Sequence, residues 1–120
     1  MKQKIFHIQE LLSRTLDTDW TVEAMADAVG LTEAYFRNLF REQTGKTPAE
    51  YLRDARLDRS YELLSDPLNF EPIKCIRAAV GLKSDSHFTH DFKKRFGHTP
   101  TAFRESIYAK YQAERQNGKR

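Results

Sequence analysis

Two stretches of the sequence carry polar side chains at helical spacing, each opposite a row of phenylalanines. The first stretch carries Ala34, Arg37, Asn38 and Arg41, and the second carries Ser86, Thr89, His90 and Lys93. Residues three and four positions apart share one side of a helix, so each set predicts one polar face. These side chains offer hydrogen bonds and positive charge, and they contain no nucleophile paired with a base. The chemistry available is recognition of another surface, not catalysis.

Helix caps and a glycine turn predict the elements that hold the first polar face. Thr21 is a good N-cap for a short helix, and Gly30 ends that helix because glycine tolerates a left-handed conformation. Thr32 caps the next helix only two residues later, and Phe36 and Phe40 point inward from it. A short helix, a tight turn and a second helix form the helix-turn-helix signature.

The same pattern occurs a second time farther along the chain. The first copy spans residues 29–48 and the second copy spans residues 80–100. The two Val-Gly-Leu tripeptides are 51 residues apart. Beyond the turn the offset is 52 residues, and it relates Phe36 to Phe88, Phe40 to Phe92, Gly45 to Gly97, and Pro48 to Pro100. We interpret this as an internal duplication and expect two copies of one structural unit.

Helix signals in the rest of the chain complete an all-α fold of seven helices. An amphipathic helix is expected in residues 3–16, and Thr47-Pro48-Ala49-Glu50 begins a long helix with a capping box. Prolines at both ends of residues 67–72 predict a hinge between the halves. We divide the chain into a first helix-turn-helix subdomain (1–47), a linker helix (48–65), a second helix-turn-helix subdomain (66–111) and a flexible basic tail (112–120).

Composition and charge exclude several classes of protein. No apolar run is long enough for a membrane span, and the N-terminal region lacks the apolar segment of a signal peptide. Cys75 is the single cysteine, so no intrachain disulfide is possible; we expect it to be buried or half-buried in a cytoplasmic protein. The net charge of +3 arises in residues 110–120, because residues 1–109 carry 16 basic and 16 acidic groups. An argument for nucleic acid therefore depends on where the charges lie.

Residues from about Trp20 to Arg104 resemble the DNA-binding region of the AraC/XylS family of bacterial transcription regulators. The match includes the linker-helix pattern Tyr51-Leu52, Arg56-Leu57 and Leu63-Leu64, and the second-copy residues Ile73, Ile76, Gly81, Ser86, Phe88, Phe92, Gly97, Thr99 and Pro100. The resemblance implies two homeodomain-like helix-turn-helix subdomains joined by a long helix, with recognition helices that enter successive major-groove segments of double-stranded DNA. It also implies regulation of transcription, which we expect to be activation, with RNA polymerase as a further partner.

The resemblance assigns two kinds of DNA contact to the polar faces. Base-reading positions are Ala34, Arg37 and Asn38 in the first copy, and Asp85, Ser86, Thr89 and His90 in the second. Phosphate contacts are expected from Thr32, Arg41, Ser84, Lys93 and Lys94, together with backbone amides at helix N-termini. Arginine can donate two hydrogen bonds to guanine and asparagine can pair with adenine, which suits Arg37 and Asn38.

The second copy departs from the family pattern more than the first. Leu82 replaces the usual phenylalanine, and Arg77 stands where the family prefers the alanine that the first copy has at Ala26. A long cation there must extend outward or loosen the helix packing. Asp85 and Asp91 place two acids on a helix that would approach phosphates. We expect the second copy to read DNA more weakly than the first.

The same residues permit other interpretations. A helical protein-interaction module with weak or lost DNA binding is the main alternative, supported by the neutral charge of residues 1–109 and by the acids of the second copy. An enzyme is rejected, and neither a cofactor nor a membrane partner is expected. His87, His90 and Asp91 have metal-ligand spacing but no further ligand completes a site. We expect a sensing or dimerisation domain to be absent from this chain, which favours a piece of a longer regulator over a short stand-alone one.

Overall fold

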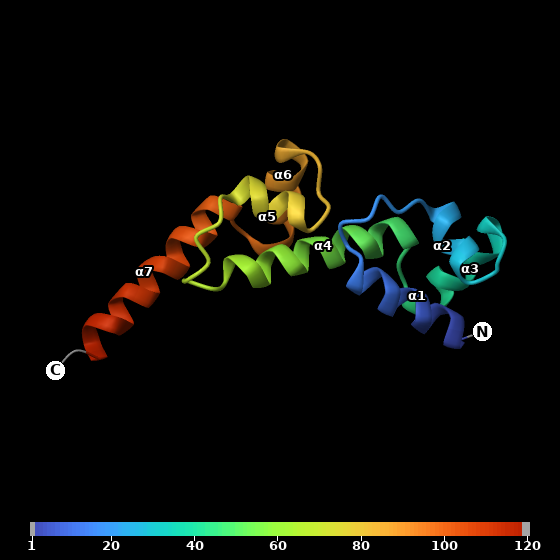
Figure 1. The fold of residues 1–120 in the computed structure, drawn as a ribbon, viewed down its shortest axis with the longest axis horizontal. Helices are drawn as coiled ribbons and strands as arrows, with labels where there is room; N and C mark the ends of the chain where they lie inside the picture. The colour runs from blue at the N-terminus through green and yellow to red at the C-terminus, as the bar shows by residue number, and fades with distance from the viewer. Residues whose placement is uncertain (1, 119–120) are drawn as a thin grey trace. The chain divides into compact units, whose positions relative to one another are not determined.

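The computed structural model describes residues 2–118, in which seven α-helices are joined by turns and no strand occurs (Figure 1). The helices are α1 (Lys2–Arg14), α2 (Val22–Ala28), α3 (Glu33–Thr44), α4 (Pro48–Leu64), α5 (Ile73–Ala79), α6 (Asp85–Phe96) and α7 (Pro100–Gly118). The predicted all-α class is confirmed. The helix starts follow the predicted caps: the Thr47 hydroxyl accepts from the Glu50 amide at 3.2 Å, and the Glu50 carboxylate accepts from the Thr47 amide at 3.0 Å.

The two glycine turns have the same geometry in both copies. Gly30 joins α2 to α3 with φ of +69°, and Gly81 joins α5 to α6 with φ of +89°. In the first turn the amides of Gly30 and Leu31 donate to the carbonyls of Asp27 and Ala26, and in the second those of Gly81 and Leu82 donate to Ala78 and Arg77. A side chain at such a φ would be strained, so glycine sets the angle at which each second helix leaves.

The chain divides into two compact units between Arg56 and Leu57, within α4. The first unit packs α1, α2, α3 and the beginning of α4 around one apolar core. That core consists of Ile5, Ile8, Leu12, Met25, Ala26, Val29, Phe36, Leu39, Phe40 and Leu52. Trp20 packs against it just before α2, and its indole N–H donates to the Thr15 carbonyl oxygen at 3.2 Å. Trp20 therefore fixes the entry to α2 against the core of the first unit.

The second unit has its own core, which is richer in aromatic rings. Its buried residues are Leu57, Leu64, Ile76, Phe88, Phe92 and Phe103. The fully buried Phe92 ring lies 4.6 Å from Phe96 and 5.9 Å from Phe103, measured between ring centroids. Offset and tilted ring pairs add stabilisation beyond the burial of their area. The core therefore holds α6 by one row of phenylalanines and leaves its other side to solvent.

Arginines connect segments that are distant in sequence within each unit. In the first unit, the Arg56 guanidinium donates to the carbonyl oxygens of Leu16 and Thr18, both at 2.8 Å. Burial lowers the pKa of Arg56 below its ordinary range, and the guanidinium remains charged at neutral pH. In the second unit, Arg95 of α6 forms a two-point pair with Asp58 of α4, at 2.8 and 3.1 Å. Forked pairs of this kind fix orientation as well as distance.

The segment between α4 and α5 lies wholly within the second unit, although the sequence predicted a hinge between the halves there. Arg104 of α7 donates to the carbonyl oxygens of Glu71 at 2.6 Å and Asn69 at 3.3 Å. Within the segment, the Asp66 carboxylate accepts from the Leu68 amide at 2.9 Å. These bonds tie the segment to α7, because a short loop with many buried or paired backbone groups is held in place.

Two further features differ from expectation. Residues 112–118, placed in the flexible tail, are the last part of α7, and only Lys119 and Arg120 of that tail lie outside the described residues. Nothing from Thr101 to Asn117 is glycine or proline, so no strong helix breaker interrupts α7. Cys75 was expected to be buried or half-buried, but it is exposed on α5. The apolar side of α5 is filled by Ile76 instead.

Candidate nucleic-acid interface

The polar side of α3 is exposed along its whole length. Ala34, Arg37, Asn38 and Arg41 are all exposed, whereas Phe36, Leu39 and Phe40 on the other side are buried. The Thr32 hydroxyl accepts from the Tyr35 amide at 3.3 Å and so caps the helix. The structure therefore brings the predicted base-reading residues of the first copy onto one solvent-facing surface.

Arg37 is held only loosely by the protein. Its Nη2 lies 2.8 Å from Oε1 of Glu33 one turn earlier, and the two side chains are 51% and 45% exposed. An exposed ion pair of this kind contributes about 0–1 kcal/mol to stability. Arg37 can therefore exchange this carboxylate for an acceptor on a partner at little cost.

The corresponding side of α6 is also exposed. Ser86, Thr89, His90, Lys93 and Lys94 all face solvent. The Ser84 hydroxyl accepts from the His87 amide at 3.2 Å and lies 3.2 Å from the Ser86 hydroxyl. His90 is 76% exposed, and its Nδ1 lies 3.4 Å from Asp91 Oδ1. The predicted residues of the second copy thus also share a surface, but no lysine or arginine lies in the first two turns of α6.

Arg77 and Asp85 form a contact that the sequence analysis did not anticipate. Arg77 does not extend into solvent: its side chain is 16% exposed, and its Nη1 donates to the Leu82 carbonyl oxygen at 2.7 Å. Its Nε lies 2.6 Å from Oδ1 of Asp85, whose side chain is 77% exposed. The same Nε is buried without an aligned hydrogen bond, so this contact is a close ion pair and not a directed hydrogen bond. The sequence contained one hint of this contact. Arg77 and Asp85 both depart from the family pattern, and they lie on either side of the same turn.

The three cations expected at phosphates remain available. Arg41, Lys93 and Lys94 are exposed, and no ion pair engages them in the part of the chain that the structure describes. By contrast, Arg56, Arg95 and Arg104 are committed to internal acceptors. The cations therefore fall into two groups: those that bind acceptors within the fold, and exposed ones that can contact an anionic partner.

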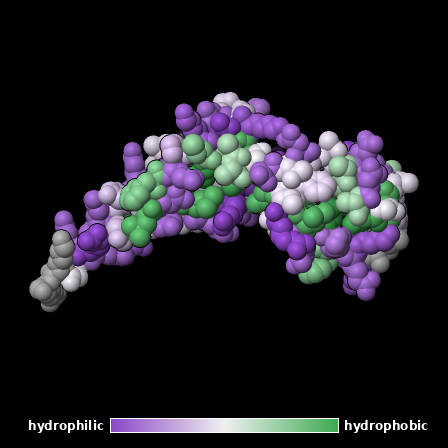
Figure 2. Space-filling model, viewed as in Figure 1, coloured by the Kyte–Doolittle hydropathy of each residue, from purple (hydrophilic) through white to green (hydrophobic). Residues whose placement is uncertain are grey.

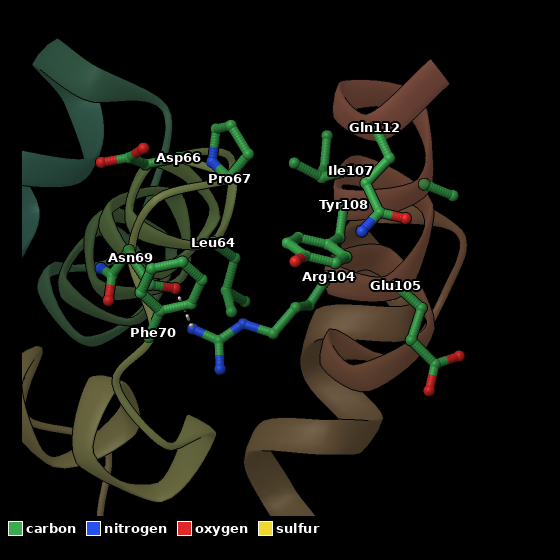
Figure 3. A pocket seen from close by; sticks show the side chains of 11 residues that line it. Leu64, Asp66, Pro67, Asn69, Phe70, Arg104, Glu105, Ile107, Tyr108 and Gln112 are labelled. Atoms are coloured by element: carbon green, nitrogen blue, oxygen red, sulfur yellow. Dashed lines mark hydrogen bonds between the residues drawn. The ribbon is translucent and has the colours of Figure 1, made fainter. Parts of the chain in front are cut away.

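An apolar groove lies elsewhere on the second unit, between α7 and the segment that follows α4. Figure 2 shows hydrophobic surface at this place, and Figure 3 shows Pro67 and Phe70 facing Ile107 and Tyr108 across a cavity of about 430 Å³. Arg104 crosses its floor toward Asn69 (dashed line in Figure 3). Phe70 is 73% exposed, so an aromatic ring stands open to solvent at this groove.

Within residues 2–118, no three His, Cys, Asp or Glu side chains gather closely enough to hold a metal ion. His87, His90 and Asp91 are among these side chains. None of the described helices combines the length and apolar character needed to cross a bilayer.

Comparison with known proteins identifies relatives by sequence. A family model described as a helix-turn-helix domain matches residues 25–106. The uncharacterised HTH-type transcriptional regulator YidL of Escherichia coli K12 is 35% identical over 101 residues, covering 84% of this chain and 33% of YidL. The RCS-specific HTH-type transcriptional activator RclR of the same organism is 35% identical over 88 residues, covering 73% of this chain and 30% of RclR. The chain thus spans about a third of the length of these curated relatives.

Solved structures show the same fold. The DNA-binding domain of AdpA, determined in complex with a target DNA, superposes with a TM-score of 0.83 at 20% identity, covering 89% of this chain and 95% of that one. A transcriptional regulator with an AraC-type DNA-binding domain from Chromobacterium violaceum superposes with a TM-score of 0.80 at 24% identity, covering 88% and 93%. At these identities the likeness concerns the fold.

Proposed function

This chain belongs to the AraC/XylS family of helix-turn-helix transcription regulators, and on this premise we propose that it binds specific sequences of double-stranded DNA through α3 and α6. The family is one of regulators and not of enzymes. The observation that carries the proposal is the pair of exposed polar faces, each on the second helix of a helix-turn-helix and each backed by buried phenylalanines.

Each face has side chains suited to the major groove, which is wide enough to admit a helix. On α3, Arg37 would donate a bidentate pair to guanine and Asn38 would pair with adenine, with Ala34 close enough to contact a thymine methyl. On α6, Ser86, Thr89, His90 and Asp85 would meet base edges. Hydroxyl groups hydrogen-bond to several bases, so this helix offers less discrimination.

Phosphate contacts would position both helices on the duplex. Arg41, Lys93 and Lys94 carry the charge, and the capped N-termini at Thr32 and Ser84 present backbone amides. We further propose that the two helices enter successive major-groove segments, about 34 Å apart along the duplex. The chain would then bind two blocks of sequence in direct repeat, because the two copies follow each other in the same chain direction.

The division into two reading subdomains (1–47 and 66–111) with a linker helix (48–65) is part of this proposal. So are a cytoplasmic location and the activation of transcription through contact with RNA polymerase. RclR is named an activator, which supports activation over repression for this chain. A promoter fused to the selected DNA site should give higher reporter output when the regulator is present; lower output would reverse the assigned sign.

Selection of bound duplexes from a random pool tests sequence-specific binding. We expect two enriched blocks in the same orientation, with the block read by α3 the more sharply defined. An enriched palindrome would contradict the geometry, and a pool that stays random after selection would contradict specific reading altogether.

Salt dependence separates DNA binding from the protein-interaction alternative. Each phosphate contact should contribute about −0.9 to the slope of log K against log salt. Lys93→Ala should reduce the magnitude of that slope by about 1 for every sequence. Lys110→Ala, which removes an equal charge from α7, is the matched control and should change it less. A flat dependence for the unmodified chain would refute the proposed function.

A further inference from the structure

The ion pair between Arg77 and Asp85 links the two helices of the second helix-turn-helix across their turn. Arg77 lies in the last turn of α5, and Asp85 is the first residue of α6. The Arg77 guanidinium also donates to the carbonyl oxygen of Leu82, inside the turn itself. One half-buried cation of α5 therefore contacts both the turn and the first residue of α6.

The two ends of this pair differ in exposure. The Arg77 side chain is 16% exposed, whereas the Asp85 side chain is 77% exposed. The cation is thus largely enclosed, and the carboxylate stands on the surface that also carries Ser86 and Thr89. Asp85 and Thr89 are four residues apart and lie on the same side of α6.

An unpaired carboxylate at this place would oppose DNA binding. Phosphate oxygens repel it, and like charges brought together at an interface weaken association. A carboxylate paired with a cation inside the protein is repelled less. It can still accept a hydrogen bond from the exocyclic amine of cytosine. Arg77 contacts Oδ1, which leaves Oδ2 as the acceptor for such an amine.

In the first copy, a different residue compensates the corresponding acid. Glu33, at the position of Asp85, pairs with Arg37 on its own helix at 2.8 Å. Ala26, at the position of Arg77, is buried and cannot balance a charge. The acid of α3 is therefore compensated on the reading surface, and the acid of α6 is compensated from inside the motif.

We propose that Arg77 is a positioning residue that balances and orients Asp85, so that α6 reads a base carrying an exocyclic amine, cytosine above all, at one position of its site. This inference rests on the proposed function. It makes Asp85 the specificity-determining residue of α6, and it makes Arg77 act on DNA only through Asp85.

The test measures binding of four chains to the duplex that the unmodified chain selects from the random pool. These are the unmodified chain, Arg77→Met, Asp85→Asn and the double variant. Methionine keeps an unbranched apolar stem in the packed site and removes the charge. Circular dichroism and the midpoint of thermal unfolding establish that each variant is folded.

Arg77→Met should weaken binding by about tenfold at low salt, because the negative charge of Asp85 would then face the DNA phosphates with no cation beside it. Adding Asp85→Asn to that variant should restore most of the lost affinity. In the unmodified background, Asp85→Asn should instead lower the preference for cytosine at one base pair by about tenfold. Asp85→Asn thus restores affinity in the Arg77→Met background and lowers selectivity in the unmodified background, a combination that a purely structural role for Arg77 would not produce.

Glu105→Gln in the Arg77→Met background is the matched control. It removes one acid from the exposed surface of α7 in the same unit, and it should not restore binding. Equal rescue by Glu105→Gln would show that total charge alone matters and would overturn the inference. So would an Arg77→Met chain that unfolds at lower temperature but binds unchanged, or one that Asp85→Asn fails to rescue.

Failure of the proposed function would look different. The unmodified chain would then bind no selected duplex, or would bind with no dependence on salt, before any variant is compared. That outcome overturns the premise and this inference together, whereas the outcomes above overturn the inference alone.

Discussion

Helices α3 and α6 occupy equivalent places in the two copies, yet they present different chemistry to solvent. The first turns of α3 carry Arg37 and Asn38, whereas the matching positions of α6 carry Thr89 and His90. Positive charge on α6 is concentrated in its last turn, at Lys93, Lys94 and Arg95. The duplicated fold therefore presents one helix with a cation and an amide in its first turns and one helix whose cations lie at its end.

The supporting cores differ in a parallel way. One tilted and one edge-to-face ring contact occur in the first unit, where Phe40 lies 5.6 Å from Phe36 and 5.3 Å from Tyr51 between centroids. In the second unit, Tyr61, Phe92, Phe96 and Phe103 form a continuous aromatic cluster. The same helix-turn-helix geometry is thus maintained by different packing, which shows that the turn and the inward phenylalanines are the shared requirement.

Removal of a central phenylalanine should have the largest effect on stability, and it should affect one unit more than the other. Phe92→Ala is expected to destabilise the second unit by about 3–5 kcal/mol, because the side chain is fully buried. Urea unfolding followed by circular dichroism should show the loss. Trp20, the single tryptophan, lies in the first unit, so its fluorescence should shift more for Phe40→Ala than for Phe92→Ala. Equal shifts from both variants would contradict separate cores.

Substitution on the reading faces tests their inequality directly. Arg37→Ala should lower discrimination at one base pair by about 1–3 kcal/mol, whereas Thr89→Ala should cost less at its own position. Binding to the selected duplex and to its single-base variants measures both. If Arg37→Ala weakened every duplex equally, Arg37 would be a phosphate contact and the assignment would be wrong.

The first helices of the two motifs are capped differently. The Thr21 hydroxyl accepts from the Ala24 amide at 3.0 Å, whereas Pro72, at the N-cap of α5, makes no side-chain cap bond. Thr21→Ala should therefore destabilise the first unit by about 1 kcal/mol. Thr21→Ser keeps the hydroxyl and should retain most of that stability. Identical losses from alanine and serine, in urea unfolding followed by Trp20 fluorescence, would exclude the cap as the cause.

A small acid-sensitive contribution should exist only in the first copy. Hydrogen bonds from the amide and the hydroxyl of Thr47 lower the pKa of Glu50 below its ordinary 4.5, while Ala102 occupies the matching place in the second copy. Because the folded pKa is lowered, the stabilisation is present above pH 4.5 and is lost as the pH falls through the folded value. Glu50→Gln should make stability slightly lower at neutral pH and less dependent on acid. An unchanged acid profile of the unfolding midpoint would contradict this.

Local signals in the sequence were sufficient for most of the fold. Threonine and serine caps, glycines at the turns and phenylalanines at helical spacing are all short-range features, and each was found where it was expected. The internal repeat also allowed one copy to be checked against the other. The seven helices and the exposed faces of α3 and α6 follow from these features.

Contacts between distant residues were the part that could not be predicted. Nothing near Arg56 or Arg104 in the sequence shows that one reaches back to Leu16 and the other to Glu71. The division within α4 could not be predicted either. It depends on whether each turn of that helix packs against the first core or the second. Arg77 was recognised as unusual, but its partner Asp85 became evident only when the turn between them was seen in three dimensions.

The place at which the chain divides has a consequence for the order of folding during synthesis. The first unit needs Leu52 to complete its core and Arg56 to secure the connection between α1 and α2, so it cannot close while only its helix-turn-helix has been made. Domains emerge from the ribosome in order and fold as units. The early turns of α4 must therefore be synthesised before the first unit can complete its core.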